Sequence, residues 1–184
     1  AHLDAARRAY GVTDRVRLEA ALERWFGSAA YSRAQACAHR EPEFPFALPV
    51  ADGVLEGEID LLCFDEPPAH AASQDGGRPG RAVDAAPLSA FIVDYKTGGS
   101  PAETVVHLKD KHRLQGQCYA FAALSAGFDA VEVVFVRVEQ DDPSGVDTLQ
   151  QVEYVYTAAD LPELARGIAA VRQNSTHPSQ IEAE

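Results

Sequence analysis

The chain has 184 residues, of which 46% are hydrophobic, and its 28 acidic residues outweigh 16 Lys and Arg to give a net charge of -12. This length suits one well-buried domain, and no apolar run is long enough to span a membrane. The acidic balance argues against wide, non-specific binding to nucleic acid. The three scattered cysteines, none in a C-x-x-C spacing, argue against a disulfide framework and against a zinc or iron-sulfur site.

The start of the sequence carries no secretory signal pattern. The N-terminus lacks the basic, apolar and small-residue sequence of a secretory signal, so we expect a cytoplasmic protein that does not enter a membrane. The sequence contains no Met. We therefore expect a domain cut from a longer chain.

The first part of the chain is predicted to be helical. It is rich in Ala, Arg, Glu and Leu, and Leu18, Leu22 and Trp25 recur at helical spacing. Gly27 followed by Ser28 predicts a break between two helices. We define residues 1–40 as an N-terminal helical segment.

A hairpin and a long loop are predicted next. Residues 44–48 and 54–64 read as strands, and the turn dipeptide Asp52-Gly53 joins them. Residues 65–89 are dominated by Pro, Gly, Ala, Asp and Ser, too poor in apolar side chains to pack well. They predict a flexible insertion.

The remaining elements complete an α/β pattern. Residues 90–94 predict a central strand, because Ile92 and Val93 sit in an uninterrupted apolar run. Two further strands and two helices follow, with Asp160 as the N-cap candidate of the last helix; their ranges are 109–125 (helix), 131–138 (strand), 150–156 (strand) and 161–172 (helix). The order predicts an α/β fold with a mixed central β-sheet flanked by helices, a core over residues 41–173 and a loose tail over 174–184.

Asp94 and Lys96 are the most informative residues of this pattern. Side chains at i and i+2 of a strand point to the same face, so the carboxylate and the amine project together. Asp60 places a second carboxylate inside another apolar strand, where an unpaired charge would be costly. Two acidic groups and a lysine are what magnesium-assisted phosphodiester hydrolysis needs. The alternative is an exposed ion pair on an edge strand.

Further residues extend the pattern on both sides. Gln115 and Tyr119, at i and i+4, share one face of the predicted helix. Taken in order, four motifs resemble the PD-(D/E)xK superfamily, specifically the RecB-like nuclease domains of AddA-type and other UvrD-like helicase-nucleases: Glu43-x-Pro45-Phe46, Gly57-x-x-Asp60, Asp94-x-Lys96-Thr97-Gly98 and Gln115-x-x-x-Tyr119.

The resemblance implies a restriction-endonuclease-like core and a role for each residue. Asp60 and Asp94 would bind Mg²⁺, with Mn²⁺ as a substitute, together with the main-chain carbonyl of Tyr95. Lys96 would be the catalytic amine. Gln115, Tyr119 and Glu43 would support the site.

Two family features are absent or displaced. RecB-like nucleases usually carry a metal-binding histidine on an N-terminal helix, and the early candidate in this sequence is His2. The cysteines that hold an iron-sulfur cluster in some relatives are missing, so the resemblance implies no such cluster.

The resemblance implies a metal-dependent DNA exonuclease domain of a helicase-nuclease that processes double-strand breaks for recombinational repair. Its partners would be single-stranded DNA ends, the helicase domains of the parent chain and a second nuclease-helicase subunit. The alternative is a catalytically inactive nuclease-like module that binds DNA or a partner subunit. A third hypothesis is an unrelated acidic α/β interaction domain, in which Asp60 and Asp94 would lie too far apart to share an ion.

Overall fold

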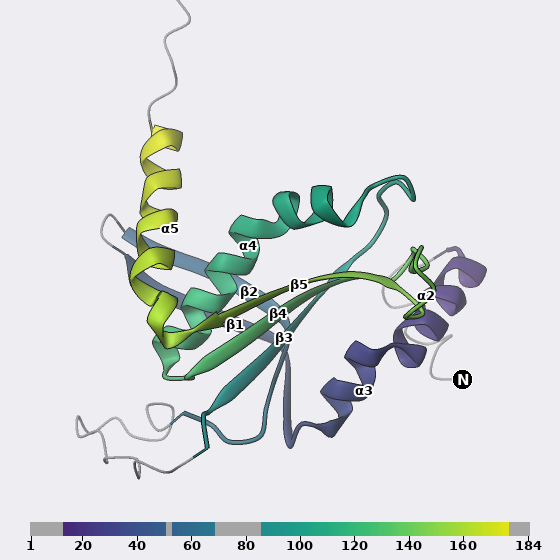
Figure 1. Cartoon of the computed structure of the whole chain (residues 1–184), viewed down its shortest axis with the longest axis horizontal. Coiled ribbons are helices and arrows are strands. Elements are labelled where there is room, and N and C mark those ends of the chain that lie inside the picture. Colours follow the sequence, from purple (N-terminus) through teal and green to yellow (C-terminus); the bar gives the residue numbers. More distant parts are fainter. Residues whose placement is uncertain (1–12, 51–52, 69–85, 177–184) are drawn as a thin grey trace, which may run out of the picture.

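The structure is a computed structural model that describes residues 13–50, 53–68 and 86–176, with side chains to residue 171 (Figure 1). His2, most of the insertion predicted at 65–89 and the end of the tail lie outside these residues. The described part contains one five-stranded sheet in the order β1-β2-β3-β4-β5, with helices on both faces. The predicted mixed α/β fold is confirmed.

The elements follow the chain in the predicted order. The helices are α2 (Arg15–Gly27), α3 (Ala29–Ala36), α4 (Val105–Ala126), the short 3₁₀ helix η2 (Ala158–Asp160) and α5 (Leu161–Thr176). The strands are β1 (His39–Val50), β2 (Gly53–Phe64), β3 (Ser89–Lys96), β4 (Ala130–Arg137) and β5 (Gln150–Thr157). The strand of Asp94 and Lys96 is therefore the central one.

The sheet is antiparallel except between β3 and β4. These two strands run parallel because α4 returns the chain across one face of the sheet, as a crossover connection requires. Figure 1 shows α4 lying along the sheet, with α5 beside it. The end of β3 and the start of α4 therefore lie close together.

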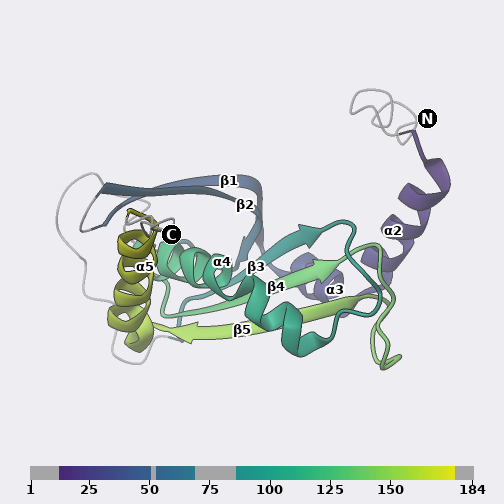
Figure 2. The same cartoon turned by 90° about the horizontal axis from the view of Figure 1, so that it is seen from above.

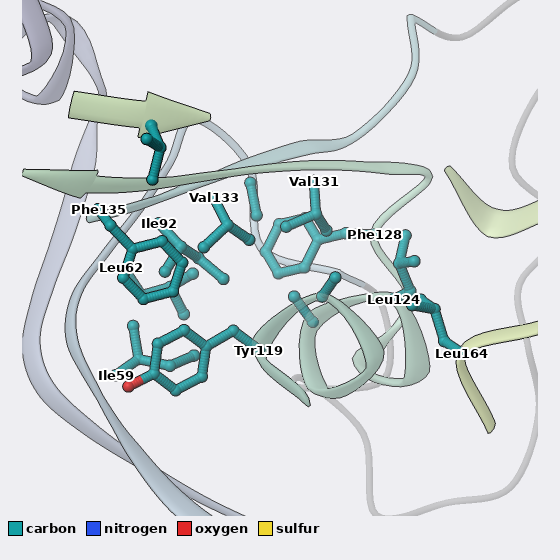
Figure 3. Packing of buried hydrophobic residues seen from close by; sticks show 14 of the residues in the cluster. Ile59, Leu62, Ile92, Tyr119, Leu124, Phe128, Val131, Val133, Phe135 and Leu164 are labelled. Carbon is teal, nitrogen blue, oxygen red and sulfur yellow. The ribbon is translucent and has the colours of Figure 1, made fainter. Parts of the chain in front are cut away.

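Alternating side chains of the strands build two cores. Ile92 of β3 and Val133 of β4 pack with Tyr119 and Leu124 of α4, as Figure 3 shows. Val93 and Val134 point to the other face and pack with Ala30 of α3. Asp94 lies two residues after Ile92 on the same strand, so its side chain is on the same face of the sheet and projects toward α4.

The N-terminal helices cover the second face. Ser28 ends α2 and caps α3, because its hydroxyl accepts the N–H of Tyr31 while its own N–H bonds the carbonyl of Trp25. The predicted break at Gly27 and Ser28 is confirmed. The Trp25 ring packs edge-on against Tyr95, with 5.0 Å between ring centroids.

The hairpin of β1 and β2 bends in the middle. Its ladder is continuous except where Glu43 would face Asp60, and Glu43 has a positive φ of 51°. Pairing between β2 and β3 stops at Leu61 and Val93, just before Asp60 would face Asp94. Beyond the bend the hairpin arches over α4 (Figure 2), and Ile59 joins the core on that side.

The first predicted strand, 44–48, is longer in the structure (His39–Val50) and begins within the range expected to be helical, because it pairs with β2 from His39 to Val50. Three further details differ from the prediction. The helix predicted from residue 109 begins at Val105, because the Thr104 hydroxyl accepts the N–H of His107 and caps it. Asp160 is not an N-cap: it closes the 3₁₀ turn by accepting the N–H of Thr157. The last helix continues to Thr176, into the range expected to be a loose tail.

Among the described residues, no helix is both long enough and apolar enough to cross a membrane.

Candidate active site

Asp60 and Asp94 meet where β2 and β3 separate. The next register position after Leu61 and Val93 would place the two aspartates opposite each other. Instead, the Asp60 carboxylate accepts the main-chain N–H of Tyr95 at 2.7 Å. This bond replaces the sheet ladder and leaves two carboxylates at the open end of the strand pair.

Burial raises the pKa of Asp60 above its ordinary value. The N–H of Tyr95 opposes this rise, and the negative charge of Asp94 adds to it. The two carboxylates are thus close enough to repel each other. Repulsion of this kind favours a positive charge between or beside them.

Asp94 is almost fully buried, with 2% of its surface exposed. One carboxylate oxygen, Oδ2, accepts bonds from Gln115 Nε2 and from the Tyr119 hydroxyl, both at 2.9 Å. The other, Oδ1, lies 2.6 Å from Lys96 Nζ but has no well-directed hydrogen bond. A buried carboxylate oxygen without a directed donor is a position that a cation suits.

The side chain of Lys96 is held from three directions. Its Nζ donates to Gln115 Oε1 at 2.9 Å, lies beside Asp94, and sits 5.3 Å from the centre of the Phe135 ring. An ammonium has three N–H donors, and Gln115 and the Asp94 ion pair engage at most two of them, so at least one is left for a further acceptor. Gln115 also donates to the Tyr119 hydroxyl at 2.7 Å, which closes a network of four side chains.

Three of the sequence motifs touch one another near this network. The Phe46 ring lies over Gly57, where a Cβ atom would come within 2.6 Å of the ring. The same ring packs edge-on against Tyr119, with 6.1 Å between centroids. Gly57 therefore has no room for a side chain, and the hairpin packs through Phe46 against α4, the helix that carries Gln115.

The other predicted residues have clear positions. Glu43 lies at the break in the hairpin ladder, where it would face Asp60 but is not paired with it, and its side chain is exposed. The main chain of Tyr95 adjoins both carboxylates, while its ring turns to the opposite face of the sheet. His2 lies outside the described residues. The structure thus brings Asp60, Asp94, Lys96, Gln115 and Tyr119 together.

Within the described residues, no group of three or more His, Cys, Asp or Glu is arranged to hold a metal ion. Two carboxylates and an adjoining carbonyl remain. Mg²⁺ usually keeps several waters and needs only one or two protein carboxylates. The buried Oδ1 of Asp94 and the repulsion between Asp60 and Asp94 fit such an ion.

Arg137, at the end of β4, was missed by the sequence analysis. It is 3% exposed, donates to Gly98 O at 3.3 Å and Ser100 O at 3.1 Å, and pairs with Glu103 at 3.0 Å. It therefore fixes the loop that follows Lys96. A charged residue directly after the apolar run of residues 133–136 was the available signal.

Glu139 holds the same loop from its other side. Its carboxylate accepts the N–H of Gly98 at 2.6 Å and pairs with Arg17 of α2 at 2.5 Å. The hydrogen bond from Arg17 and the N–H of Gly98 lower the pKa of Glu139, against an opposing effect of burial. The N-terminal helical segment is thus linked to the loop after Lys96.

A hollow of about 730 Å³ lies on the opposite face, between α2 and the ends of β3 and β4. Leu18, Leu22, Trp25 and Tyr95 make it largely apolar. None of Asp60, Asp94 and Lys96 lines it. It is separate from the carboxylate cluster.

A mixed five-stranded sheet flanked by helices, with Asp94 on the central strand β3 and Asp60 on the neighbouring strand β2, is consistent with a restriction-endonuclease-like α/β fold. The family model of the PD-(D/E)XK nuclease superfamily matches residues 76–184, more than half of the chain. The chain belongs to this superfamily, whose members are generally nucleases that hydrolyse phosphodiester bonds. The match contains Asp94, Lys96, Gln115 and Tyr119 but not Asp60. No curated protein matches the chain.

Proposed function

We propose that the chain is a magnesium-dependent DNA nuclease domain whose active site is formed by Asp60, Asp94 and Lys96. One observation supports this most strongly. The buried Oδ1 of Asp94, with Lys96 at 2.6 Å and Asp60 across the parted strands, provides both a cation position and an amine next to it.

In this proposal Asp60, Asp94 and the main-chain carbonyl of Tyr95 hold the divalent ion. When bound, the ion supplies Lewis acidity that polarises the phosphate and lowers the pKa of a coordinated water. The Asp60 carboxylate is kept in place by the N–H of Tyr95, and Asp94 by Gln115 and Tyr119. These bonds fix the carboxylates before substrate arrives, which lowers the cost of reorganisation.

Lys96 acts on the substrate side of the site. Its remaining N–H binds a phosphate oxygen or the attacking water, and its charge offsets the charge that grows on the phosphate. Gln115 orients the ammonium by accepting one N–H at 2.9 Å. Gln115 and Tyr119 are positioning residues in this scheme.

We further propose that the domain is RecB-like and works as an exonuclease on single-stranded DNA ends within a helicase-nuclease for double-strand break repair. The ordered motifs from Glu43 to Tyr119 and the packing of Phe46 on Gly57 and Tyr119 support this narrower assignment. The helicase domains of the parent chain and a second subunit would be its partners.

The test is cleavage of end-labelled single-stranded DNA by the purified chain with MgCl₂, MnCl₂ or EDTA. Cutting should require the metal and should be lost in Asp94→Ala and Lys96→Ala, with both variants folded by circular dichroism. Lys109→Ala, an exposed charge on α4, is the matched control. Full activity in both site variants would reject the assignment.

The alternative, an inactive module, makes a different prediction for metal binding. Lys96 already contacts Asp94 Oδ1, so a scaffold could keep this ion pair in place of a cation. Calorimetry with MnCl₂ separates the two. An active site should bind Mn²⁺ and lose that binding in Asp60→Ala, whereas a scaffold should show no dependence on Asp60.

A further inference from the structure

A separate pocket of about 200 Å³ opens beside Lys96. Lys111, His112 and Gln115 of α4 line one side, and the loop at Gly98 and Gly99 lines another. His112 stacks on Phe135, with 4.9 Å between ring centroids, and so forms a flat wall. The pocket adjoins the candidate active site through Lys96 and Gln115.

The pocket is positively charged although the chain is acidic. Its charged lining residues are Lys96, Lys111 and Arg137 against the carboxylate of Glu103. In a chain with a net charge of -12, this local excess of cations marks a place where an anion is favoured. Cationic ligands are disfavoured there.

Donors of the pocket already contact one carboxylate of the protein itself, that of Glu103. The Glu103 carboxylate lies 3.0 Å from Lys111 Nζ and 3.0 Å from Arg137 Nη2, and it accepts the N–H of Ser100 at 3.1 Å. The hydrogen bond from Lys111 is the main cause that lowers the pKa of Glu103. Lys111 is half-exposed, so its ammonium can turn from Glu103 toward an incoming anion.

The loop wall of the pocket admits a close approach. Gly98 and Gly99 have positive φ of 71° and 83°, which glycine adopts readily. A Cβ on Gly98 would meet no atom within 4 Å, so open space lies before its backbone. A Cβ on Gly99 would instead meet the Arg137 guanidinium and the Glu103 carboxylate. The part of this wall that a polymer backbone can approach is therefore at Gly98.

We propose that this pocket is a subsite for a phosphate group of the bound DNA strand, contacted by Lys111 and adjacent to the phosphodiester held at Lys96. The inference rests on the proposed nuclease function. The phosphate is either an internal phosphodiester or the terminal phosphate of a DNA end, since both present the same oxyanion. Lys111 is a binding residue in this scheme, and it takes no part in the bond cleavage.

The test measures DNA binding without cleavage. A 3′-fluorescein oligothymidine of about 12 nucleotides is titrated with protein in EDTA, and fluorescence anisotropy is followed between about 50 and 200 mM salt. Lys111→Ala should weaken binding at least about threefold and reduce the slope of log affinity against log salt by about 0.7, as loss of one single-strand phosphate contact does.

Lys109→Ala is the matched control, because Lys109 is an exposed residue of the same helix and does not line the pocket. It should bind DNA like the wild type. Equal affinity of Lys111→Ala and wild type, or an equal loss in both variants, overturns the subsite. Thermal unfolding confirms that both variants are folded.

Two comparisons complete the experiment. An oligothymidine with a 5′ phosphate is compared with one that ends in a hydroxyl. An effect of Lys111→Ala confined to the phosphorylated strand assigns the terminal phosphate, and an equal effect on both strands assigns an internal one.

Cleavage by the wild type in MgCl₂ is scored separately. Normal cleavage with no binding change in Lys111→Ala rejects the subsite alone, and a binding change without any cleavage rejects the nuclease function alone.

Discussion

Replacing Tyr119 by Phe should destabilise the protein through the carboxylate of Asp94. Tyr119 is 6% exposed, and its ring packs against Phe46 and Phe135 at 6.1 and 6.3 Å between centroids. Phenylalanine keeps these ring contacts. It removes only the hydroxyl that donates to Asp94 Oδ2 and accepts from Gln115.

The size of the stability loss follows from the hydrogen bonds that Asp94 loses and keeps. Asp94 keeps the bond from Gln115 but loses a donor, and a hydrogen bond to a charged group contributes about 1.5 to 3 kcal/mol. We expect a loss of about 2 kcal/mol in the free energy of unfolding. For a chain of this size that corresponds to a fall in Tm of about 4 to 8 °C.

Thermal unfolding and urea titration, both followed by circular dichroism, measure this loss. Tyr156→Phe is the control, because its ring is half-buried in the same core and its hydroxyl makes no hydrogen bond with the described residues. It should change stability by less than about 0.5 kcal/mol. A Tyr119→Phe variant as stable as the control would show that the network around Asp94 contributes nothing to the fold.

Three further predictions concern the hairpin and the loop after β4. Gly57→Val should lower the free energy of unfolding in urea titrations by about 1 to 3 kcal/mol, because its Cβ would come within 2.6 Å of the Phe46 ring; an unchanged unfolding midpoint would contradict this clash. Glu43→Gly should raise stability by less than about 1 kcal/mol, since glycine relieves the positive φ, and a loss measured by thermal unfolding would contradict this reading. The Asp142 carboxylate accepts hydrogen bonds from the Ser144 hydroxyl and from the N–H groups of Ser144, Val146 and Asp147. These bonds, and the one from the Ser144 hydroxyl most of all, lower the pKa of Asp142 from 3.8 to about 2. Its contribution to stability is therefore complete above its ordinary pKa and is lost as the pH falls toward about 2, so the Tm difference between wild type and Asp142→Asn should shrink over that range.

The order of elements and the common face of Asp94 and Lys96 could be predicted from the sequence. Apolar runs with period two identify strands, and the same periodicity places Asp94 with Ile92. The start of α4 was placed too late, because Val105 and Val106 are β-branched and do not resemble a helix start. The Thr104 cap was the sequence signal for the true boundary.

The bend at Glu43 and the role of Arg137 could not be predicted in this way. No local propensity favours a positive φ on a glutamate, and Glu43 lies at the break in the hairpin ladder. Arg137 has partners at Gly98, Glu103 and Gln150, which are distant in sequence and meet only in the folded chain. Both features depend on tertiary structure.

The chain of contacts from Arg17 through Glu139 to Gly98 bears on how the protein tolerates truncation. A shortened version that starts at β1 keeps every strand and both candidate metal-binding aspartates, yet it loses the guanidinium that neutralises Glu139. The Glu139 carboxylate would then lie unneutralised beside the loop that follows Lys96. Deletion of α2 and α3 is therefore expected to change how the domain binds an anionic polymer, even if the remaining sheet still folds.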